Sequence, residues 1–462
     1  QIYTLNNAGL IIADNGAHAV NMSGAKAAIA NSGIISATAS PAILAGASSV
    51  ISISGSVLAG GANPVAIALE GRGSTVNLSD GAIIAGTIAP LDTATNYTEE
   101  QKHRVNVSGV NNASYYYEFP TEQFRFFLNN VEKTDGSGFS PATTNLQAVP
   151  LIHAHHAQGT RNIWRRLGRF DDKGGVRSFA FAEELENERR TDREFTLEGD
   201  RSGFVQTFQQ SIFGWFEAEL ILTAQESSFE LDNNIFTFDK SYQGVGLGFS
   251  DLLAIGPFSF SAMALTGIAQ TDMSRLVLSN TVSSGRFNLE SSFDTIYLDA
   301  AFEALFDMRI WGKKGRLTRR NPYRINLELG LGGSLHDENN DGYNEQTYIS
   351  AAESDLQSTS VGGRLKFEYE RYNPYSRKNI RGFLELEHSV FDTGSGLDFS
   401  YSVEGAAQLA SIDMAAVALS SIALGVDYEV NDDITANFSL KSVTGDDDSD
   451  GNSVALALKW RF

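Results

Sequence analysis

The sequence contains no cysteine, and this absence excludes disulfide bonds, thiolate metal sites and thiol nucleophiles together. Basic residues are also scarce, with 35 Lys and Arg against 56 Asp and Glu, for a net charge of −21. Because nucleic-acid binding needs a basic face, this balance argues against a nucleic-acid partner. No apolar run reaches the roughly 18 residues that a membrane-spanning helix needs, so a helical membrane protein is excluded. A transmembrane β-barrel needs no such run and remains compatible with the sequence.

The composition divides the 462 residues into two parts. Residues 1–90 are rich in Ala, Gly, Ser, Asn and Ile, and they contain few charged and almost no aromatic residues. From about residue 175 onward, Phe, Tyr, Glu and Arg are frequent. A hydrophobic share of 42% is enough to build a core. We therefore predict an all-β chain with two different architectures.

A glycine-containing unit repeats in the first part. Its glycines, Gly9, Gly33, Gly55 and Gly81, are 24, 22 and 26 residues apart, and short alternating runs surround them. A period of about 20–30 residues with short strands and glycine turns is typical of a solenoid. We predict a right-handed parallel β-helix of about four coils over residues 1–90, with small Ala and Ser inside and Asn or Gly at the corners.

Aromatic residues cluster in the next segment, 91–145, which we interpret as a junction. The cluster consists of Tyr115, Tyr116, Tyr117, Phe119, Phe124, Phe126 and Phe127. An open last coil would present an edge that recruits strands from other molecules. We predict that the aromatic segment caps the solenoid and covers this edge.

Strict alternation is the strongest pattern in the second part. Near the C-terminus, Val454, Leu456, Leu458, Trp460 and Phe462 fall on one face of a strand, opposite Ala, Lys and Arg. The same alternation predicts twelve strands, near 175–186, 201–211, 213–228, 241–253, 257–271, 293–310, 323–336, 357–372, 379–392, 415–430, 433–443 and 453–462.

A soluble β-sandwich is the alternative to a membrane barrel. Its strands would average about 5–6 residues, whereas these run to about ten or more. Tight turns also alternate with long polar loops, which are expected at 187–200, 272–292, 337–356, 392–414 and 443–452. Short periplasmic turns and long external loops characterise outer-membrane barrels, and an even strand number puts both barrel ends on the periplasmic side. We predict a 12-stranded antiparallel transmembrane barrel over residues 173–462.

A basic helix is predicted between the two parts, over residues 146–172. Its second half carries Arg161, Arg165, Arg166 and Arg169. The inward face of the predicted barrel carries carboxylates, namely Glu217, Glu219, Asp299, Glu303, Glu328, Glu385 and Glu387. A chain coming from an external solenoid must also cross the membrane to reach a periplasmic first strand. We predict that the helix fills the lumen, where its arginines form charge-assisted pairs, and an exposed linker helix is the alternative.

The order of solenoid, connecting helix and twelve-stranded barrel ending in Lys459-Trp460-Arg461-Phe462 resembles the classical monomeric autotransporters of Gram-negative bacteria, the type V secretion proteins. The resemblance spans nearly the whole chain and rests on architecture. It implies an outer-membrane translocator, surrounded by lipid and lipopolysaccharide, that exports its N-terminal passenger and keeps the helix as a plug. It also implies that Trp460 and Phe462 belong to a signal read by the barrel-assembly machinery. The displayed passenger would be an adhesin or surface module with an unidentified ligand.

No enzyme is predicted. The expected passenger lacks a G-x-S-x-G elbow, and its acidic residues Asp14, Glu70 and Asp80 are too scattered for a polysaccharide-cleaving β-helix. Some members of the resembled family cleave themselves at paired asparagines in the lumenal helix. Here the pairs Asn111-Asn112 and Asn129-Asn130 precede that helix, so self-cleavage is not expected.

Two acidic segments match the first half of a calcium-binding loop. They are Asp446, Asp448 and Asp450 in a D-x-D-x-D-G pattern, and Asp337, Asn339 and Asp341 in a D-x-N-x-D-G pattern. Both lack the bidentate Glu at position 12 and fall in predicted external loops, where weak millimolar binding suffices. The sequence thus predicts weak calcium sites, with solvated acidic turns as the alternative, and no other cofactor.

Two functions remain in competition. One is self-export and surface display of the passenger, and the other is a plugged or open porin-like channel with a short external stalk. A plugged translocator should pass little current until residues 146–170 are removed, whereas a porin should conduct when intact.

Overall fold

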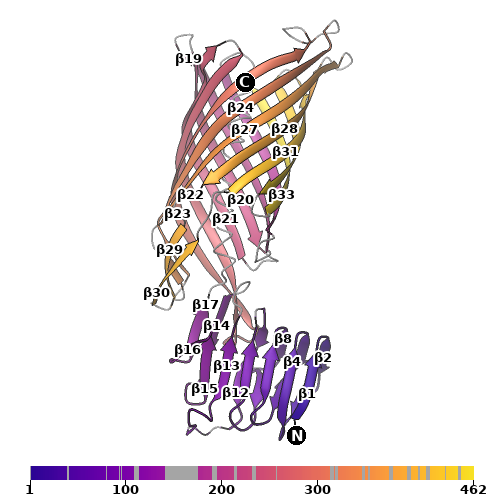
Figure 1. Ribbon diagram of the computed structural model, residues 1–462, viewed down its shortest axis with the longest axis vertical. Coiled ribbons are helices and arrows are strands. Elements are labelled where there is room, and N and C mark those ends of the chain that lie inside the picture. Colours follow the sequence, from indigo (N-terminus) through magenta and orange to yellow (C-terminus); the bar gives the residue numbers. More distant parts are fainter. Residues whose placement is uncertain are drawn as a thin grey trace.

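The computed structural model describes residues 2–38, 41–79, 81–92, 94, 96–108, 114–140, 175–189, 195–212, 216–231, 236–255, 257–312, 317, 321–345, 349–351, 354–373, 378–392, 397–403, 406–412, 417–431, 433–445 and 449–461. Within them, all elements are strands, arranged as a body of stacked short strands and a barrel of long strands placed end to end (Figure 1). The described residues include no helix long and apolar enough to cross a membrane. The predicted helix over 146–172 lies outside them.

Fifteen short strands form the first body. They are β1 (Ile2–Asn7), β2 (Leu10–Ala13), β3 (Val20–Met22), β4 (Lys26–Asn31), β5 (Ile34–Ala37), β6 (Ile43–Ala45), β7 (Val50–Ile53), β8 (Ser56–Ala59), β9 (Val65–Leu69), β10 (Thr75–Leu78), β11 (Ile83–Ala85), β12 (Thr87–Pro90), β13 (His103–Val107), β15 (Phe124–Leu128) and β16 (Val131–Lys133). Three sheets result, with orders β1-β4-β7-β10-β13-β15-β16, β11-β8-β5-β2 and β12-β9-β6-β3, and their strands pair in parallel except β15 with β16. Successive strand triplets therefore form stacked coils, as predicted.

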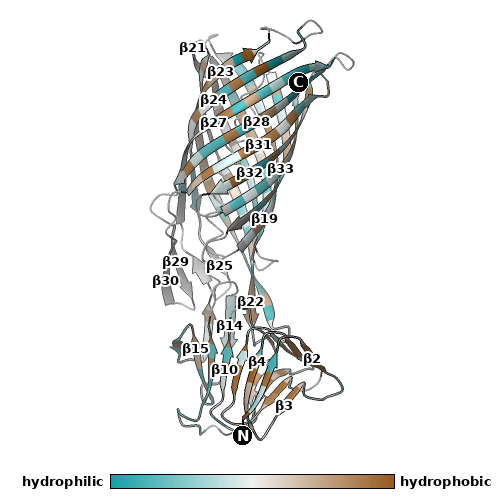
Figure 2. Ribbon diagram, turned by 45° about the vertical axis from the view of Figure 1, so that its right-hand side comes forward, coloured by the Kyte–Doolittle hydropathy of each residue, from teal (hydrophilic) through white to brown (hydrophobic). Residues whose placement is uncertain are grey.

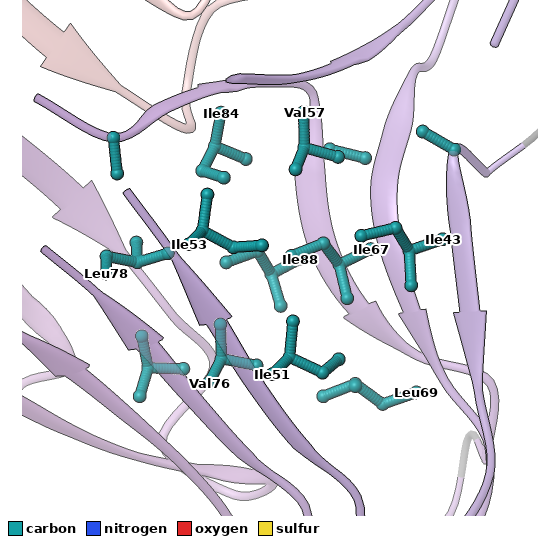
Figure 3. Packing of buried hydrophobic residues seen from close by; sticks show 14 of the residues in the cluster. Ile43, Ile51, Ile53, Val57, Ile67, Leu69, Val76, Leu78, Ile84 and Ile88 are labelled. Atoms are coloured by element: carbon teal, nitrogen blue, oxygen red, sulfur yellow. The ribbon is translucent and has the colours of Figure 1, made fainter. Parts of the chain in front are cut away.

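Branched aliphatic side chains fill the interior of the coils (Figure 3). The pairing register places Ile29, Ile51, Val76, Val105 and Phe126 in one continuous inward ladder, each against its counterpart in the next coil. Buried Ala and Ser also occur, as predicted, but they do not make up the core alone. The three-sided cross-section leaves room for larger β-branched residues, which pack well on pleated surfaces.

Asparagine and glycine occupy the corners between sheets, as predicted. Asn7 Nδ2 donates a hydrogen bond of 2.7 Å to Asn31 Oδ1 in the next coil. A Cβ atom at Gly33 would collide with the carbonyl oxygen of Gly9, and one at Gly55 would collide with that of Gly33. At Gly33 and Gly55 the glycine therefore follows from close backbone stacking at the corner, whereas Gly81 has no atom within 4 Å and instead has a φ of +83°, which favours glycine.

Aromatic rings fill the solenoid at the end nearest the barrel. Tyr115 and Tyr117 lie in β14 (Ser114–Glu118), with ring centroids 5.9 Å apart. Phe119 packs against Phe126 of β15 at 5.0 Å, and these side chains are buried in one cluster with Val105. The larger rings thus replace the aliphatic ladder in the last coils, and β16 forms the final edge of the sheet.

His103 is buried among these rings, and we expect it to make the solenoid sensitive to acid. Its Nδ1 accepts a hydrogen bond of 3.2 Å from the backbone N–H of Ser74, and the rings of Tyr97 and Phe124 flank it. Loss of hydration lowers the pKa of His103 from 6.5 to about 4. Between these pH values the unfolded chain binds a proton that the folded chain does not. Stability should therefore fall by about 3 kcal/mol as the pH drops through this interval, and this loss should level off below the folded pKa.

Urea unfolding of the parent and of His103→Gln, followed across this pH range by tyrosine fluorescence, checks the prediction. The variant should lose the part of the acid sensitivity that His103 causes, whereas the parent should retain it. Equal slopes of stability against pH in both proteins would contradict the assignment.

Twelve long strands form the second body. They are β18 (Gly175–Arg189), β19 (Phe195–Ile212), β20 (Phe216–Leu231), β21 (Phe236–Ile255), β22 (Phe258–Ser279), β23 (Arg286–Trp311), β24 (Tyr323–Asn340), β27 (Ser354–Asn373), β28 (Lys378–Asp392), β31 (Val417–Glu429), β32 (Ile434–Gly445) and β33 (Ser449–Arg461). Each pairs antiparallel with its neighbours, and β18 pairs with both β19 and β33, which closes the barrel. All twelve strands correspond to predicted ones.

Both ends of the barrel chain lie at the mouth remote from the solenoid (Figure 1). Arg177, near the start of β18, pairs with Arg461 at the end of β33. The predicted even strand count and common side are thus confirmed. The facing ends of β19 and β20, β21 and β22, β23 and β24, β27 and β28, and β31 and β32 lie at the same mouth.

At the mouth next to the solenoid, several segments predicted to be loops contain strands instead. The predicted loop 272–292 is mostly strand, because β22 and β23 stay paired up to Leu278 and Arg286 and project beyond the barrel to the solenoid. We call residues 270–294 the β22–β23 protrusion. Its outward positions are polar except Leu276, so the outward apolar pattern of the barrel strands ends before the strands do. Two other expected loops contain β25 (Tyr343–Glu345), β26 (Ile349–Ala351), β29 (Leu397–Val403) and β30 (Ala406–Ile412), which form a small sheet.

Candidate functional site

An apolar belt surrounds the barrel exterior. Leu331 and Val361 point outward with 69% and 67% of their surface exposed. Along β22 the outward positions are mostly apolar from Phe258 to Ile268 and become polar at Gln270. At about 3.4 Å per residue and a tilt of about 45°, such a run spans about 24 Å along the barrel axis, close to the roughly 25 Å apolar height of a transmembrane barrel. Figure 2 shows the corresponding alternation of hydrophobic and hydrophilic residues along the strands.

Charged and polar side chains are buried inside the barrel. Large apolar residues such as Phe179, Ile221 and Leu265 are buried beside them. So many buried charged residues would be unusual in the core of a soluble protein. The buried charged residues on the barrel strands are Arg177, Arg201, Glu219, Lys240, Arg275, Asp299, Glu303, His336, Glu338, Arg364, Lys366 and Glu370. A buried charge is costly unless it has an ionic or hydrogen-bonding partner, and several of these residues pair with each other.

Arg364 of β27 holds three carboxylates from three other strands. Its Nε is 2.7 Å from Oε1 of Glu303 on β23, and its Nη2 is 2.5 Å from Oε1 of Glu328 on β24. Its Nη1 is 3.4 Å from Oε2 of Glu385 on β28. Gly330 makes space for the guanidinium, since a Cβ there would lie 2.8 Å from Arg364 Nε. The Arg364 side chain, only 1% exposed, therefore ties four strands together by charge-assisted hydrogen bonds.

A second network crosses the interior. Lys240 Nζ on β21 lies 2.6 Å from both carboxylate oxygens of Glu338 on β24. In the sheet, β22 and β23 lie between β21 and β24. The Lys240–Glu338 ion pair therefore reaches across the barrel interior to connect two strands that are not neighbours. His336 Nε2 is 2.9 Å from Glu338 Oε1, and His336 Nδ1 bonds Asp299. Tyr242 adds a hydroxyl 3.4 Å from Glu338.

Six of the seven predicted lumenal carboxylates lie inside the barrel, namely Glu219, Asp299, Glu303, Glu328, Glu385 and Glu387. The side chain of the seventh, Glu217, lies outside the described part. The predicted partners Arg161, Arg165, Arg166 and Arg169 also lie outside it, so their pairing stays a prediction.

Sequence reasoning missed that the barrel supplies cations of its own. Arg177 lies 3.6 Å from Glu219, and Lys441 lies 3.8 Å from Glu387, in addition to the Arg364 and Lys240 contacts. The available signal was their position, since each occupies the polar face of an alternating strand. Alternation shows that a charge points inward but not which carboxylate it meets.

The terminal aromatic residues are only partly described. Trp460 lies on the outward face of β33, with its ring 5.8 Å from that of Phe204. Phe462 lies outside the described residues. Recognition of Trp460 and Phe462 by the barrel-assembly machinery stays a prediction.

One of the two expected calcium loops is not a loop. Asp337 and Asn339 belong to β24, which stays paired with β27 up to Asn340. A calcium loop curls around its ion, whereas an extended strand places alternate side chains about 7 Å apart. In the other segment, Asp450 belongs to β33, and Asp446 and Asp448 lie outside the description. Among the residues that the structure describes, no group of three His, Asp or Glu side chains is placed to hold a metal, and Asp341 is exposed.

Neither a protein-family profile nor a curated protein matches the sequence. Solved structures do match the fold. One is the translocator domain of the autotransporter NalP from Neisseria meningitidis, at a TM-score of 0.49 and 14% identity, covering 68% of this chain and 98% of that one. Another is the transport unit of the autotransporter AIDA-I from Escherichia coli, at a TM-score of 0.43 and 11% identity, covering 64% of this chain and 92% of that one.

An outer-membrane channel of Pseudomonas putida F1 is also similar. Its TM-score is 0.37 and its identity 9%, and the match covers 63% of this chain and 96% of that one. Translocators and channels thus both occur among the similar structures.

Proposed function

We propose that this chain is an outer-membrane autotransporter of a Gram-negative bacterium, whose barrel exports the β1–β17 solenoid and displays it on the cell surface. One observation carries the proposal. Strand β17 (Ser137–Ser140) ends at the mouth next to the solenoid, whereas β18 begins with Gly175 at the opposite mouth. The 34 residues between them connect the two mouths. This is the connection expected of a passenger that leaves through its own barrel.

A route through the lumen fits the charges better than a route outside. The outer wall is apolar over the belt, and four arginines in lipid would be costly. The interior carries the carboxylates around Arg364 and Lys240 described above. A helix over 146–170 would be about 38 Å long, enough to pass the apolar belt. We therefore propose that this segment is a lumenal plug, with Arg161, Arg165, Arg166 and Arg169 facing the acidic wall.

The proposed orientation puts the solenoid outside the cell and both barrel ends in the periplasm. Outer-membrane lipid and lipopolysaccharide then contact the belt, and the barrel-assembly machinery handles the C-terminal strand. Stacked coils present a long regular surface, which suits adhesion to an unidentified surface ligand. We propose a binding role and no enzymatic role for the passenger.

Conductance in planar bilayers separates this function from a porin-like channel. The intact chain should pass little current, and deletion of residues 146–170 should open a large steady conductance because the plug is gone. Changing Arg161, Arg165, Arg166 and Arg169 to Gln should give frequent openings, because the plug loses its ionic partners. The matched control changes the exposed Arg286, Arg309 and Arg371 to Gln and should stay closed. High conductance of the intact chain would favour the channel and contradict the proposal.

A further inference from the structure

One edge of β22 continues past the strand that pairs with it. The register between β21 and β22 ends with Phe236 opposite Arg275, while β22 continues to Ser279. Strand β14 of the solenoid occupies the edge beyond this point. Ser114, Tyr115 and Tyr116 pair in parallel with Val277, Leu278 and Ser279. The sheet of the barrel thus extends into the solenoid in the order β17-β14-β22.

Asn280 continues this pairing with its side chain. Its Nδ2 donates to the carbonyl oxygen of Glu118 at 2.9 Å, and its Oδ1 accepts from the backbone N–H of Glu118 at 3.1 Å. The amide therefore bonds both backbone groups of one residue, as a neighbouring strand would. These bonds fix the end of β14 next to the protrusion.

Apolar side chains seal the same contact. Leu278 is buried in the solenoid core together with Tyr115. Val277 and Leu289 of the protrusion form a separate buried cluster with Phe139 of β17. Backbone pairing gives such a contact affinity, and side chains in alternate pockets give it specificity.

The turn of the β22–β23 protrusion touches the solenoid directly. A Cβ at Gly285 would lie 2.9 Å from the carbonyl oxygen of Ile84 and 3.0 Å from the amide nitrogen of Ala85. Gly285 also has a φ of +72°, which favours glycine. Only glycine at this turn allows the protrusion to lie this close to β11.

We propose that the β22 edge at Leu276–Ser279 is a receptor site for strand β14, and that this docking holds the solenoid on the barrel when the connection 141–174 is cut. The occupant is the antiparallel β14–β17 pair of the same chain, with β14 added to the barrel edge by β-augmentation. Docking also covers an edge that would otherwise pair with foreign strands. The inference stands whether or not the barrel exports the solenoid.

A cleavable full-length chain tests the proposal. A protease recognition sequence inserted directly after Ser140 allows the connection to be cut in the folded protein in detergent micelles. After cleavage, the two fragments should co-elute in size-exclusion chromatography and separate only in denaturant. Asn280→Ala and Gly285→Val should each release the solenoid about tenfold faster or more, since each removes contacts or forces the surfaces apart. Asn288→Ala, an exposed site on the same protrusion, should behave like the parent.

Three outcomes would overturn the proposal. They are immediate separation of the parent fragments, equal retention by the parent and both altered proteins, and rapid release by the Asn288→Ala control. Heat-modifiable migration of the barrel in gel electrophoresis shows that each variant has folded.

Cysteine cross-linking gives an independent reading, because the chain has no cysteine of its own. Ser114→Cys with Val277→Cys should form a disulfide readily, since the two positions face each other on paired strands. Ser114→Cys with Asn288→Cys should not, because β23 is a further strand away, about 10 Å from β14. A cross-link in the second pair, or none in the first, would also refute docking at this edge.

Discussion

Replacing Arg364 with Met is expected to lower the free energy of unfolding of the barrel by about 3–5 kcal/mol. The variant keeps most of the side-chain volume but leaves Glu303, Glu328 and Glu385 without the guanidinium that they share. Like charges in a confined interior repel one another and lose solvation. Urea unfolding in detergent micelles or liposomes measures the loss.

The matched control is Arg371→Met, an exposed site on the same strand, which should change stability by no more than about 0.5 kcal/mol. Adding Glu303→Gln to Arg364→Met should recover part of the loss, because one uncompensated charge disappears. Purely additive effects in this double-mutant cycle would mean that the two residues do not interact in the folded barrel.

Replacing Leu331 with Arg is expected to cost about 2–4 kcal/mol in lipid, the range for a cation near the middle of a transmembrane barrel. Leu331 lies among the outward apolar residues of β24 and is 69% exposed. The cost should shrink in detergent micelles, which deform more easily around a charge than a bilayer does. The check is the loss in free energy of unfolding caused by Leu331→Arg, measured once in liposomes and once in detergent micelles.

Gln270→Arg is the control, since Gln270 also points outward but lies beyond the apolar run of β22. It should have little effect in either medium. Equal costs at both positions would show that the belt does not contact lipid.

The proposed display on the cell surface and the docking of β14 make different demands on the structure. Export needs a passage through the barrel from the mouth near Ser140, where β17 ends, to the mouth near Gly175, where β18 begins. Docking needs only the β22 edge and Asn280. If the intact chain conducts strongly in bilayers but the cleaved fragments still co-elute, the protein would be a barrel channel with a fixed external stalk. The two experiments therefore separate translocation from retention.

Several features were determined by the sequence alone because they depend on local periodicity. Alternation along β24 and β33 identified the strands and the side of each residue, since successive side chains in a strand point to opposite faces. The spacing of Gly9, Gly33 and Gly55 identified the coils, since stacked backbones leave no room for a Cβ at Gly33 or Gly55. In both cases one repeated local constraint fixes the pattern.

The pairings between distant segments were decided only by the tertiary structure. Lys240 meets Glu338 across 98 residues, and Glu118 meets Asn280 across 162. The expected loop 272–292 became strand because β22 and β23 continue to pair beyond the apolar belt, and β14 fills the remaining edge. Periodicity shows which way a side chain points, whereas barrel closure and strand register determine what it meets. The ion pairs and the docking edge therefore followed from the folded chain and not from its pattern.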